Sequence, residues 1–209
     1  EVLTSLYRGF NAPILRVDLK TAEMIKYATN AFLATKISFI NEIGNICKGM
    51  GIDVYRVAEG ISLDARISPD FLNAGIGFGG SCLPKDLKAL TSAALSIGYQ
   101  ARLLQSVLAI NEQQPSKLVE VAERKAGGLK GKRVAILGLA FKPGTDDIRE
   151  APALKIIQEL LDKGAQITAY DPQAMDHVRQ TLGSKITYAA TAKEAVAGAE
   201  LVLITTEWD

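Results

Sequence analysis

The chain has 209 residues, of which 48% are hydrophobic and 22% charged, and its formal net charge is +1. The balanced charge excludes the basic surface typical of nucleic-acid binding, and the uncharged stretch 89–101 is too short and too polar to span a bilayer. Two cysteines, Cys47 and Cys82, make no disulfide framework and fit a reducing compartment. We therefore expect a cytoplasmic protein without nucleic-acid or membrane partners.

Both ends of the sequence look like cuts. The chain starts at Glu1 rather than at methionine, and it stops at Asp209 directly after a strand-like run. We expect a fragment of a longer protein, with one large domain or two small ones in the part given.

After a lead-in of about 17 residues, one long helix is predicted. Asp18 or Thr21 can cap it, and it is expected to run to about Lys48 and end at Gly49 and Gly51. About thirty residues span about 45 Å, more than a small domain needs. Because the helix is apolar on most faces and has to be buried, we expect it to form a homodimer core. Cys47, near its end, is interpreted as structural.

Within this helix, Lys26 and Asn30 are four residues apart, so they share a face and can point at one spot. The pattern alone favours two solvated surface residues. A short helix follows, capped by Asp53 and ended by Gly60. The next stretch, 61–83, has little periodicity, and a loop this long in a compact chain is usually functional.

A glycine-dense segment closes that loop: Gly75-Ile76-Gly77-Phe78-Gly79-Gly80-Ser81-Cys82-Leu83-Pro84-Lys85-Asp86. Pro84 suits a first helical turn, so Cys82 comes just before a helix N-terminus, where a thiolate is favoured. Lys85 would add to this effect and Asp86 would oppose it. The pattern fits a nucleophilic cysteine beside a backbone cradle. A buried structural cysteine or a plain phosphate site fits it as well.

The helix from Pro84 is predicted to reach about Ser96, and another runs from about Arg102 to Lys125, broken or kinked at Pro115. Glycines at 127, 128 and 131 then mark a boundary between two domains, 1–126 and 127–209. Strands at 133–137, 166–170, 186–188 and 201–205 alternate with helices at 151–163, 173–182 and 191–199. This order indicates a parallel, Rossmann-like sheet.

The turn after the first of these strands is not G-x-G-x-x-G, so a dinucleotide is not its default ligand. The loop after that strand is still where such a sheet binds ligands, and polar residues lie in it. They are Lys142, Asp146, Asp147 and Arg149.

Three segments together resemble the UDP-glucose/GDP-mannose 6-dehydrogenase family: Thr21 to Ala34, Phe71 to Asp86, and Leu137 to Asp147 with Arg149. The closing Thr206-Glu207-Trp208-Asp209 fits too. The resemblance keeps its order over nearly the whole chain. It implies a multi-domain α and α/β protein, in which a long-helix dimerisation domain precedes a Rossmann-like nucleotide-sugar-binding domain. It also implies that the family's N-terminal NAD domain is missing from this chain.

The resemblance implies an NAD-dependent, four-electron oxidation of the C6 hydroxyl of a nucleotide sugar, with UDP-glucose as substrate and UDP-glucuronate as product. Cys82 would carry a thiohemiacetal and then a thioester. Lys26 and Asn30 would stabilise the oxyanion, and Asp86 would assist water or proton transfer. The alternatives are a GDP-mannose 6-dehydrogenase and a non-catalytic dimerisation and nucleotide-binding module. The fragment alone is expected to be inactive.

The resemblance also implies which residues bind the cofactor and the substrate, and it implies no metal ion. NAD would contact Lys85 and Arg149. Ser81 occupies the position before the cysteine where the N-acetyl-mannosamine branch of the family typically has histidine, which argues against that branch. Leu83, which follows the cysteine, is also found in GDP-mannose 6-dehydrogenases. The expected contacts to the nucleotide sugar, one of them from Arg66 across the dimer, are Lys26, Arg66, Phe71, Leu72, Asn73, Ala74, Gly75, Gly79 and Lys142.

Overall fold

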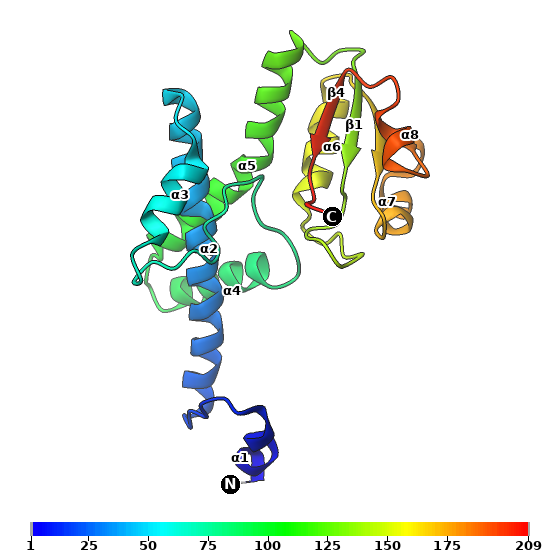
Figure 1. The fold of residues 1–209 in the computed structure, drawn as a ribbon. Coiled ribbons are helices and arrows are strands. Elements are labelled where there is room, and N and C mark those ends of the chain that lie inside the picture. The colour runs from blue at the N-terminus through cyan, green and yellow to red at the C-terminus, as the bar shows by residue number, and fades with distance from the viewer. Residues whose placement is uncertain (1, 209) are drawn as a thin grey trace.

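The computed structural model describes residues 2–208, so Glu1 and Asp209, the last residue of the closing segment, lie outside it. A helical part comes first and a sheet with its helices follows (Figure 1). The helices of the first part are α1 (Val2–Tyr7), α2 (Leu19–Met50), α3 (Val54–Ser62), α4 (Leu83–Ser96) and α5 (Arg102–Ala126), with a 3-10 turn at Arg8–Phe10.

The long helix α2 begins and ends at residues with capping chemistry. The Asp18 carboxylate accepts a hydrogen bond from the Thr21 N–H at 3.0 Å, as predicted for the N-cap. At the other end Gly51 takes the left-handed conformation, and its N–H bonds to the Cys47 carbonyl. Gly49 was expected to end the helix and instead lies inside it, because one left-handed residue is enough to stop a helix.

Two further expectations were wrong in detail. The lead-in contains α1, although no periodic pattern marks so short a helix. Helix α3 passes Gly60 and ends at Ser62. Of the two effects expected at Pro115, a break does not occur: helix α5, which packs against both α2 and α6, continues past the proline although its ring removes one backbone donor.

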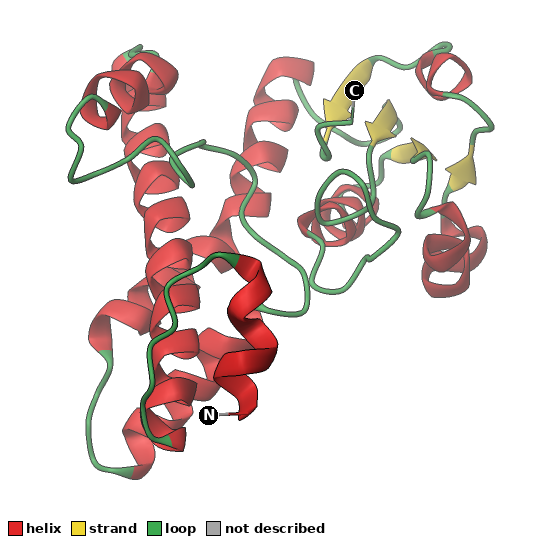
Figure 2. Ribbon diagram, turned by 60° about the horizontal axis from the view of Figure 1, so that its bottom comes forward, coloured by secondary structure: helices red, strands yellow, loops and turns green. Residues whose placement is uncertain are grey.

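The second part is a parallel sheet in the order β3-β2-β1-β4. Central β1 pairs with β2 and β4, so that Ala135 lies beside Thr168 on one side and Val202 on the other. The sheet and its helices form the predicted Rossmann-like arrangement, with helices on both sides of the row of strands (Figure 2). The elements are β1 (Arg133–Leu137), α6 (Pro152–Asp162), β2 (Gln166–Tyr170), α7 (Met175–Leu182), a 3-10 turn (Gly183–Lys185), β3 (Thr187–Tyr188), α8 (Ala192–Val196) and β4 (Leu201–Ile204).

Helix α5 belongs to two hydrophobic cores. Near its start, Val107 packs with Ala34 of α2 and Leu87 of α4. Near its end, Val119 and Ala122 join the core under the sheet. The helix then stops at Gly127, which is left-handed. We propose the boundary between the two domains, 1–126 and 127–209, at this turn.

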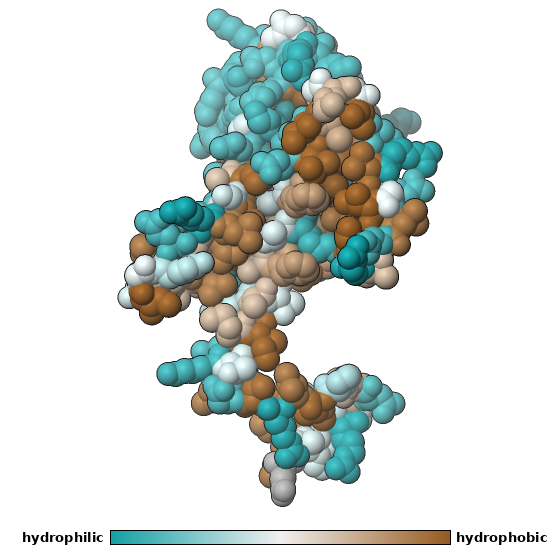
Figure 3. Space-filling view, turned by 90° about the vertical axis from the view of Figure 1, so that its left-hand side faces the viewer, coloured by the Kyte–Doolittle hydropathy of each residue, from teal (hydrophilic) through white to brown (hydrophobic). Residues whose placement is uncertain are grey.

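Several apolar side chains of α2 remain exposed. Ile25, Phe32, Phe39 and Ile46 follow one another at intervals of seven residues, which places them in one stripe along the helix. Figure 3, which faces the α2 and α3 side of the molecule, shows apolar side chains gathered there. Within residues 2–208, no helix combines the length and the hydropathy needed to cross a bilayer.

The buried carboxylate of Asp171 fixes the turn after β1. Its Oδ2 accepts the N–H groups of Leu139 at 2.6 Å and Ala140 at 3.1 Å, and its Oδ1 accepts those of Gln173 and Ala174, both at 2.8 Å. Burial alone would raise the pKa of Asp171, but these backbone donors outweigh it and hold the pKa below its usual value.

Replacing Asp171 with Asn should destabilise the folded protein. In asparagine one of the two acceptor oxygens is replaced by an N–H₂ group, which cannot accept hydrogen bonds from the backbone N–H groups. We therefore expect the unfolding free energy, measured by urea titration, to fall by about 2–4 kcal/mol. Asp176→Asn, at an exposed position of α7, should lose less than about 0.5 kcal/mol. Equal losses in both variants would contradict the role given to Asp171.

Candidate active site

A buried carboxylate lies at the centre of the candidate site. Asp86, in the first turn of α4, has no exposed side-chain surface. Its Oδ2 accepts hydrogen bonds from Lys26 Nζ and, at 2.6 Å, from Asn30 Nδ2, both on α2. Its Oδ1 accepts one from Lys85 Nζ at 2.6 Å. The structure thus brings together Lys26 and Asn30, which the sequence placed on one helix face, with Lys85 and Asp86 of the cysteine segment.

The opposite charges in this cluster stabilise the ionised forms of both the carboxylate and the lysines. Hydrogen bonds from Lys26 and then Lys85 hold the pKa of Asp86 well below its usual range, against the effect of burial. The carboxyl is therefore ionised at any physiological pH. In turn, the hydrogen bond to Asp86 raises the pKa of Lys85. Two ammonium groups around one carboxylate leave a net positive charge beside the cysteine segment.

The Cys82 thiol is exposed at the start of α4, as the sequence predicted. Its main-chain carbonyl accepts the Asp86 N–H at 2.9 Å, which places the thiol one helical turn from the buried carboxylate. Arg149 lies against the segment that precedes Cys82, because its carbonyl accepts the Gly80 N–H, and its ion pair with Asp147 raises the pKa of Arg149.

The glycine segment docks on the sheet-containing part of the chain. The Gly80 N–H donates to the Arg149 carbonyl at 2.8 Å. A Cβ at Gly79 would lie 2.3 Å from the Glu150 carbonyl oxygen, so only glycine fits there. At this position the close neighbour is the protein's own backbone, whereas the sequence suggested the approach of a ligand.

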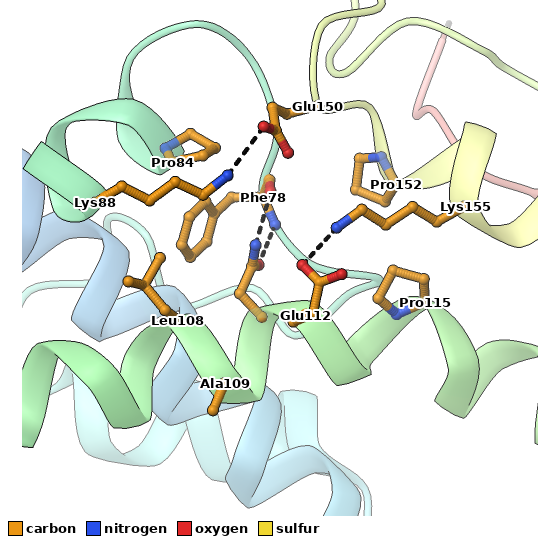
Figure 4. A pocket seen from close by; sticks show the side chains of 11 residues that line it. Phe78, Pro84, Lys88, Leu108, Ala109, Glu112, Pro115, Glu150, Pro152 and Lys155 are labelled. Carbon is orange, nitrogen blue, oxygen red and sulfur yellow. Dashed lines mark hydrogen bonds and ion pairs between the residues drawn. The ribbon is translucent and has the colours of Figure 1, made fainter.

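Two ion pairs flank this contact. Lys88 of α4 pairs with Glu150 at 3.1 Å, and Glu112 of α5 pairs with Lys155 of α6 at 2.6 Å (Figure 4). They lie at the rim of a pocket of about 280 Å³ whose wall includes Phe78.

A second pocket, of about 430 Å³, gathers much of the predicted substrate set. Phe71, Asn73, Gly79 and Lys142 all line it, so that the long loop and the sheet-containing part face each other there. Phe71 has φ 63°, a left-handed conformation uncommon for a bulky residue. Such conformations are concentrated at functional sites.

The remaining predicted substrate contacts lie elsewhere in this chain. Arg66 is exposed and pairs with Asp64 of its own loop at 2.6 Å. Leu72 is buried. Ala74 and Gly75 line a different pocket, of about 460 Å³. The backbone of Gly75 is already bonded, its N–H to Asn41 Oδ1 at 2.7 Å and its carbonyl to Gln114 Nε2 at 2.8 Å.

Sequence reasoning missed the side-chain amides that hold the glycine segment. They are Asn41 on α2 and Asn111 and Gln114 on α5, each bonded to backbone groups between Gly75 and Phe78. The one sequence feature that could have indicated this role is the spacing of Asn111 and Gln114, three residues apart on one face of α5. Amide side chains at such spacing usually face solvent.

The arrangement around Cys82 fits an anionic cofactor by charge. Lys85 and Arg149, the two residues predicted to contact NAD, are exposed cations that flank the cysteine segment. The turn after β1 lacks the dinucleotide fingerprint G-x-G-x-x-G. Between residues 2 and 208, no group of three His, Cys, Asp or Glu side chains is placed to hold a metal ion.

Known proteins match both parts of the chain. Residues 20–113 match the central domain of the UDP-glucose/GDP-mannose dehydrogenase family, and residues 135–209 match the UDP binding domain of the same family. The chain is 50% identical over 208 residues to the UDP-glucose 6-dehydrogenase YwqF of Bacillus subtilis (strain 168), covering all of this chain and 47% of that protein.

Two archaeal proteins agree with this match. The chain is 50% identical over 202 residues to the UDP-glucose 6-dehydrogenase AglM of Haloferax volcanii, covering 97% of this chain and 46% of that protein. A UDP-glucose dehydrogenase structure from Pyrobaculum islandicum superimposes with a TM-score of 0.96 at 42% identity, covering 99% of this chain and 48% of that one. The chain thus spans about half the length of the relatives it matches. Because the two family models together match most of the sequence in the right order, the chain belongs to the UDP-glucose/GDP-mannose dehydrogenase family.

Proposed function

We propose that this chain is the substrate-site half of an NAD-dependent UDP-glucose 6-dehydrogenase, which oxidises the C6 hydroxyl of UDP-glucose to the carboxylate of UDP-glucuronate. The observation that carries the proposal is an exposed thiol, Cys82, beside a buried carboxylate that gathers Lys26 and Asn30. The names of the relatives and the matched UDP-binding domain support the substrate. Residues outside this chain would bind most of NAD.

In the proposed reaction, NAD when bound accepts one hydride in each of two oxidations. In the first, the C6 alcohol loses a hydride from carbon and a proton from oxygen, which leaves an aldehyde. The Cys82 thiolate then forms a C–S bond to the aldehyde carbon, and the thiohemiacetal loses the second hydride and a proton to become a thioester. Water adds to its carbonyl, the C–S bond breaks, and the carboxylate and the thiolate are released. One cysteine serves both steps because a thiolate is a strong nucleophile and a reasonable leaving group.

The neighbours of Cys82 would stabilise the charge that develops on oxygen. Lys26 supplies a cation and Asn30 an amide donor on the same face of α2, and preorganised donors of this kind stabilise an oxyanion. Asp86 orients both groups. As an ionised carboxylate bonded to three donors, it is a weak proton acceptor, so its contacts support a positioning role more than the role of a general base.

We also propose that two copies of the chain pair through α2. The stripe of Ile25, Phe32, Phe39 and Ile46 is exposed, and burying such a row against a second copy would remove it from water. In this arrangement Arg66, which pairs with Asp64 of its own loop, would reach the nucleotide sugar of the partner copy. Lys142, near the Phe141 ring, would contact the nucleotide sugar from its own copy.

Replacing Cys82 with Ser should abolish acid formation in the intact protein that carries this chain. A serine hydroxyl is a much poorer nucleophile than a thiolate. The rate of UDP-glucuronate formation from NAD and UDP-glucose, measured by chromatography of the product, should therefore fall by about 10³-fold or more. Cys47→Ser, at the buried cysteine of α2, should keep the same chemistry. Release of acid at the wild-type rate by Cys82→Ser would rule out the thioester route.

The variant Asp86→Asn should show how the cluster depends on pH. The folded-state pKa of Asp86 lies below its unfolded value of about 3.9, so its ion pairs stabilise the fold fully above that pH, and the stabilisation decreases as the pH falls from there through the folded-state pKa. We expect wild type to exceed the variant in unfolding free energy at pH 7, and the difference to shrink at pH 3, by urea titration. A difference that is the same at both pH values would contradict the ion-pair account.

The variant Phe32→Asp should separate the dimer. Placing a carboxylate in the α2 stripe puts two like charges into an apolar contact, so light scattering after gel filtration should report a monomer for the variant and a dimer for wild type. Leu95→Asp changes an equally exposed apolar residue on α4 and should leave the dimer intact. A Phe32→Asp dimer that survives dilution would place the interface elsewhere.

A further inference from the structure

The segment that leads to Cys82 is held by side chains rather than by backbone partners. Between Ala74 and Phe78, the described backbone bonds go to Tyr55, Asn41, Gln114 and Asn111. Because the hydrogen bonds of this loop go to side chains of the neighbouring helices, those helices determine its position. We propose that Asn111 of α5 is a positioning residue for Cys82, an inference that rests on the function proposed above.

Asn111 bonds to both main-chain groups of one residue. Its Oδ1 accepts the Phe78 N–H at 2.7 Å, and its Nδ2 donates to the Phe78 carbonyl at 3.0 Å (Figure 4, dashed lines at Phe78). A side-chain amide here replaces the neighbouring strand of a sheet, which exchanges the same two bonds with a paired residue. The pair fixes the backbone of Phe78, four residues before Cys82.

The neighbouring backbone leaves little room for adjustment. Gly77 has φ 102°, and a Cβ there would lie 2.8 Å from Asn111 Oδ1, so the chain runs directly against this amide. One helical turn further along α5, Gln114 bonds to the Gly75 carbonyl at 2.8 Å and is itself held by Asn45 of α2 at 3.0 Å. Asn111 and Gln114 thus hold the segment from the same face of α5.

The segment is anchored again just before the thiol. Gly80 bonds to the Arg149 carbonyl, and Gly79 lies against Glu150. Only Gly79 separates Phe78 from the anchored Gly80, so a shift of Phe78 strains the short stretch that leads to Cys82. Phe78 also lines both the pocket of about 280 Å³ and the pocket of about 430 Å³ that contains the predicted substrate residues. Asn111 therefore sets the thiol relative to Lys85 and Arg149 without touching the substrate.

The test is the variant Asn111→Asp in the intact protein. It keeps an acceptor for the Phe78 N–H, removes the donor to the Phe78 carbonyl, and places a carboxylate against that oxygen. We expect kcat to fall about tenfold or more while KM for UDP-glucose stays within about threefold, since misplacement affects the chemical step more than nucleotide binding. The alkylation rate of Cys82 by iodoacetamide, followed by mass spectrometry without NAD or sugar, should change by about threefold or more.

The control is Gln113→Ala, two residues along α5 at an exposed position, which should match wild type in both readouts. If Asn111→Asp does not fold, Asn111→Gln, which keeps both groups one methylene further out, takes its place. Wild-type alkylation and wild-type kcat in the variant would overturn the inference, as would a lower unfolding midpoint with neither readout changed. Absence of turnover in wild type would contradict the proposed function instead, and the alkylation rates alone would then decide the role of Asn111.

Discussion

The buried carboxylate of Asp86 is the interaction on which the candidate site depends. A buried charge is tolerated only where partners compensate it, and here Lys26 and Asn30 of α2 and Lys85 of α4 do so. Because α2 and α4 also pack through Leu87, the carboxylate can hold its partners only while the two helices keep their contact. The environment of Cys82 is thus fixed by residues more than 50 positions earlier in the chain.

The sheet-containing part completes this environment through its backbone. Gly80 bonds to the Arg149 carbonyl, and the missing side chain of Gly79 lets Glu150 approach, so that the backbone of Arg149 lies against the segment that leads to Cys82. Helix α5 gives the contact its rigidity, because its first half belongs to the core of the helical part and its last turns belong to the core of the sheet. A movement between the two parts would therefore alter the surroundings of Cys82 directly.

Local patterns in the sequence predicted much of this. The first two strands fall at the predicted 133–137 and 166–170, because buried apolar runs between glycine-rich turns leave few alternatives. The spacing of Lys26 and Asn30 predicted a shared target but not that the target is Asp86, since that contact joins two helices. The roles of Gly79 and Asn111 could not be predicted, because each depends on a residue more than thirty positions away that approaches only in the folded chain.

The most direct test of the account is to count electrons in the intact protein that carries this chain. NADH formed per sugar consumed should be measured with UDP-glucose and, separately, with GDP-mannose. The account predicts about two NADH per UDP-glucose and none with GDP-mannose, because a thioester at Cys82 requires a second oxidation. One NADH per sugar would mean that the reaction stops at the aldehyde, so that Cys82 does not act as proposed, and none with either sugar would favour a non-catalytic nucleotide-binding module.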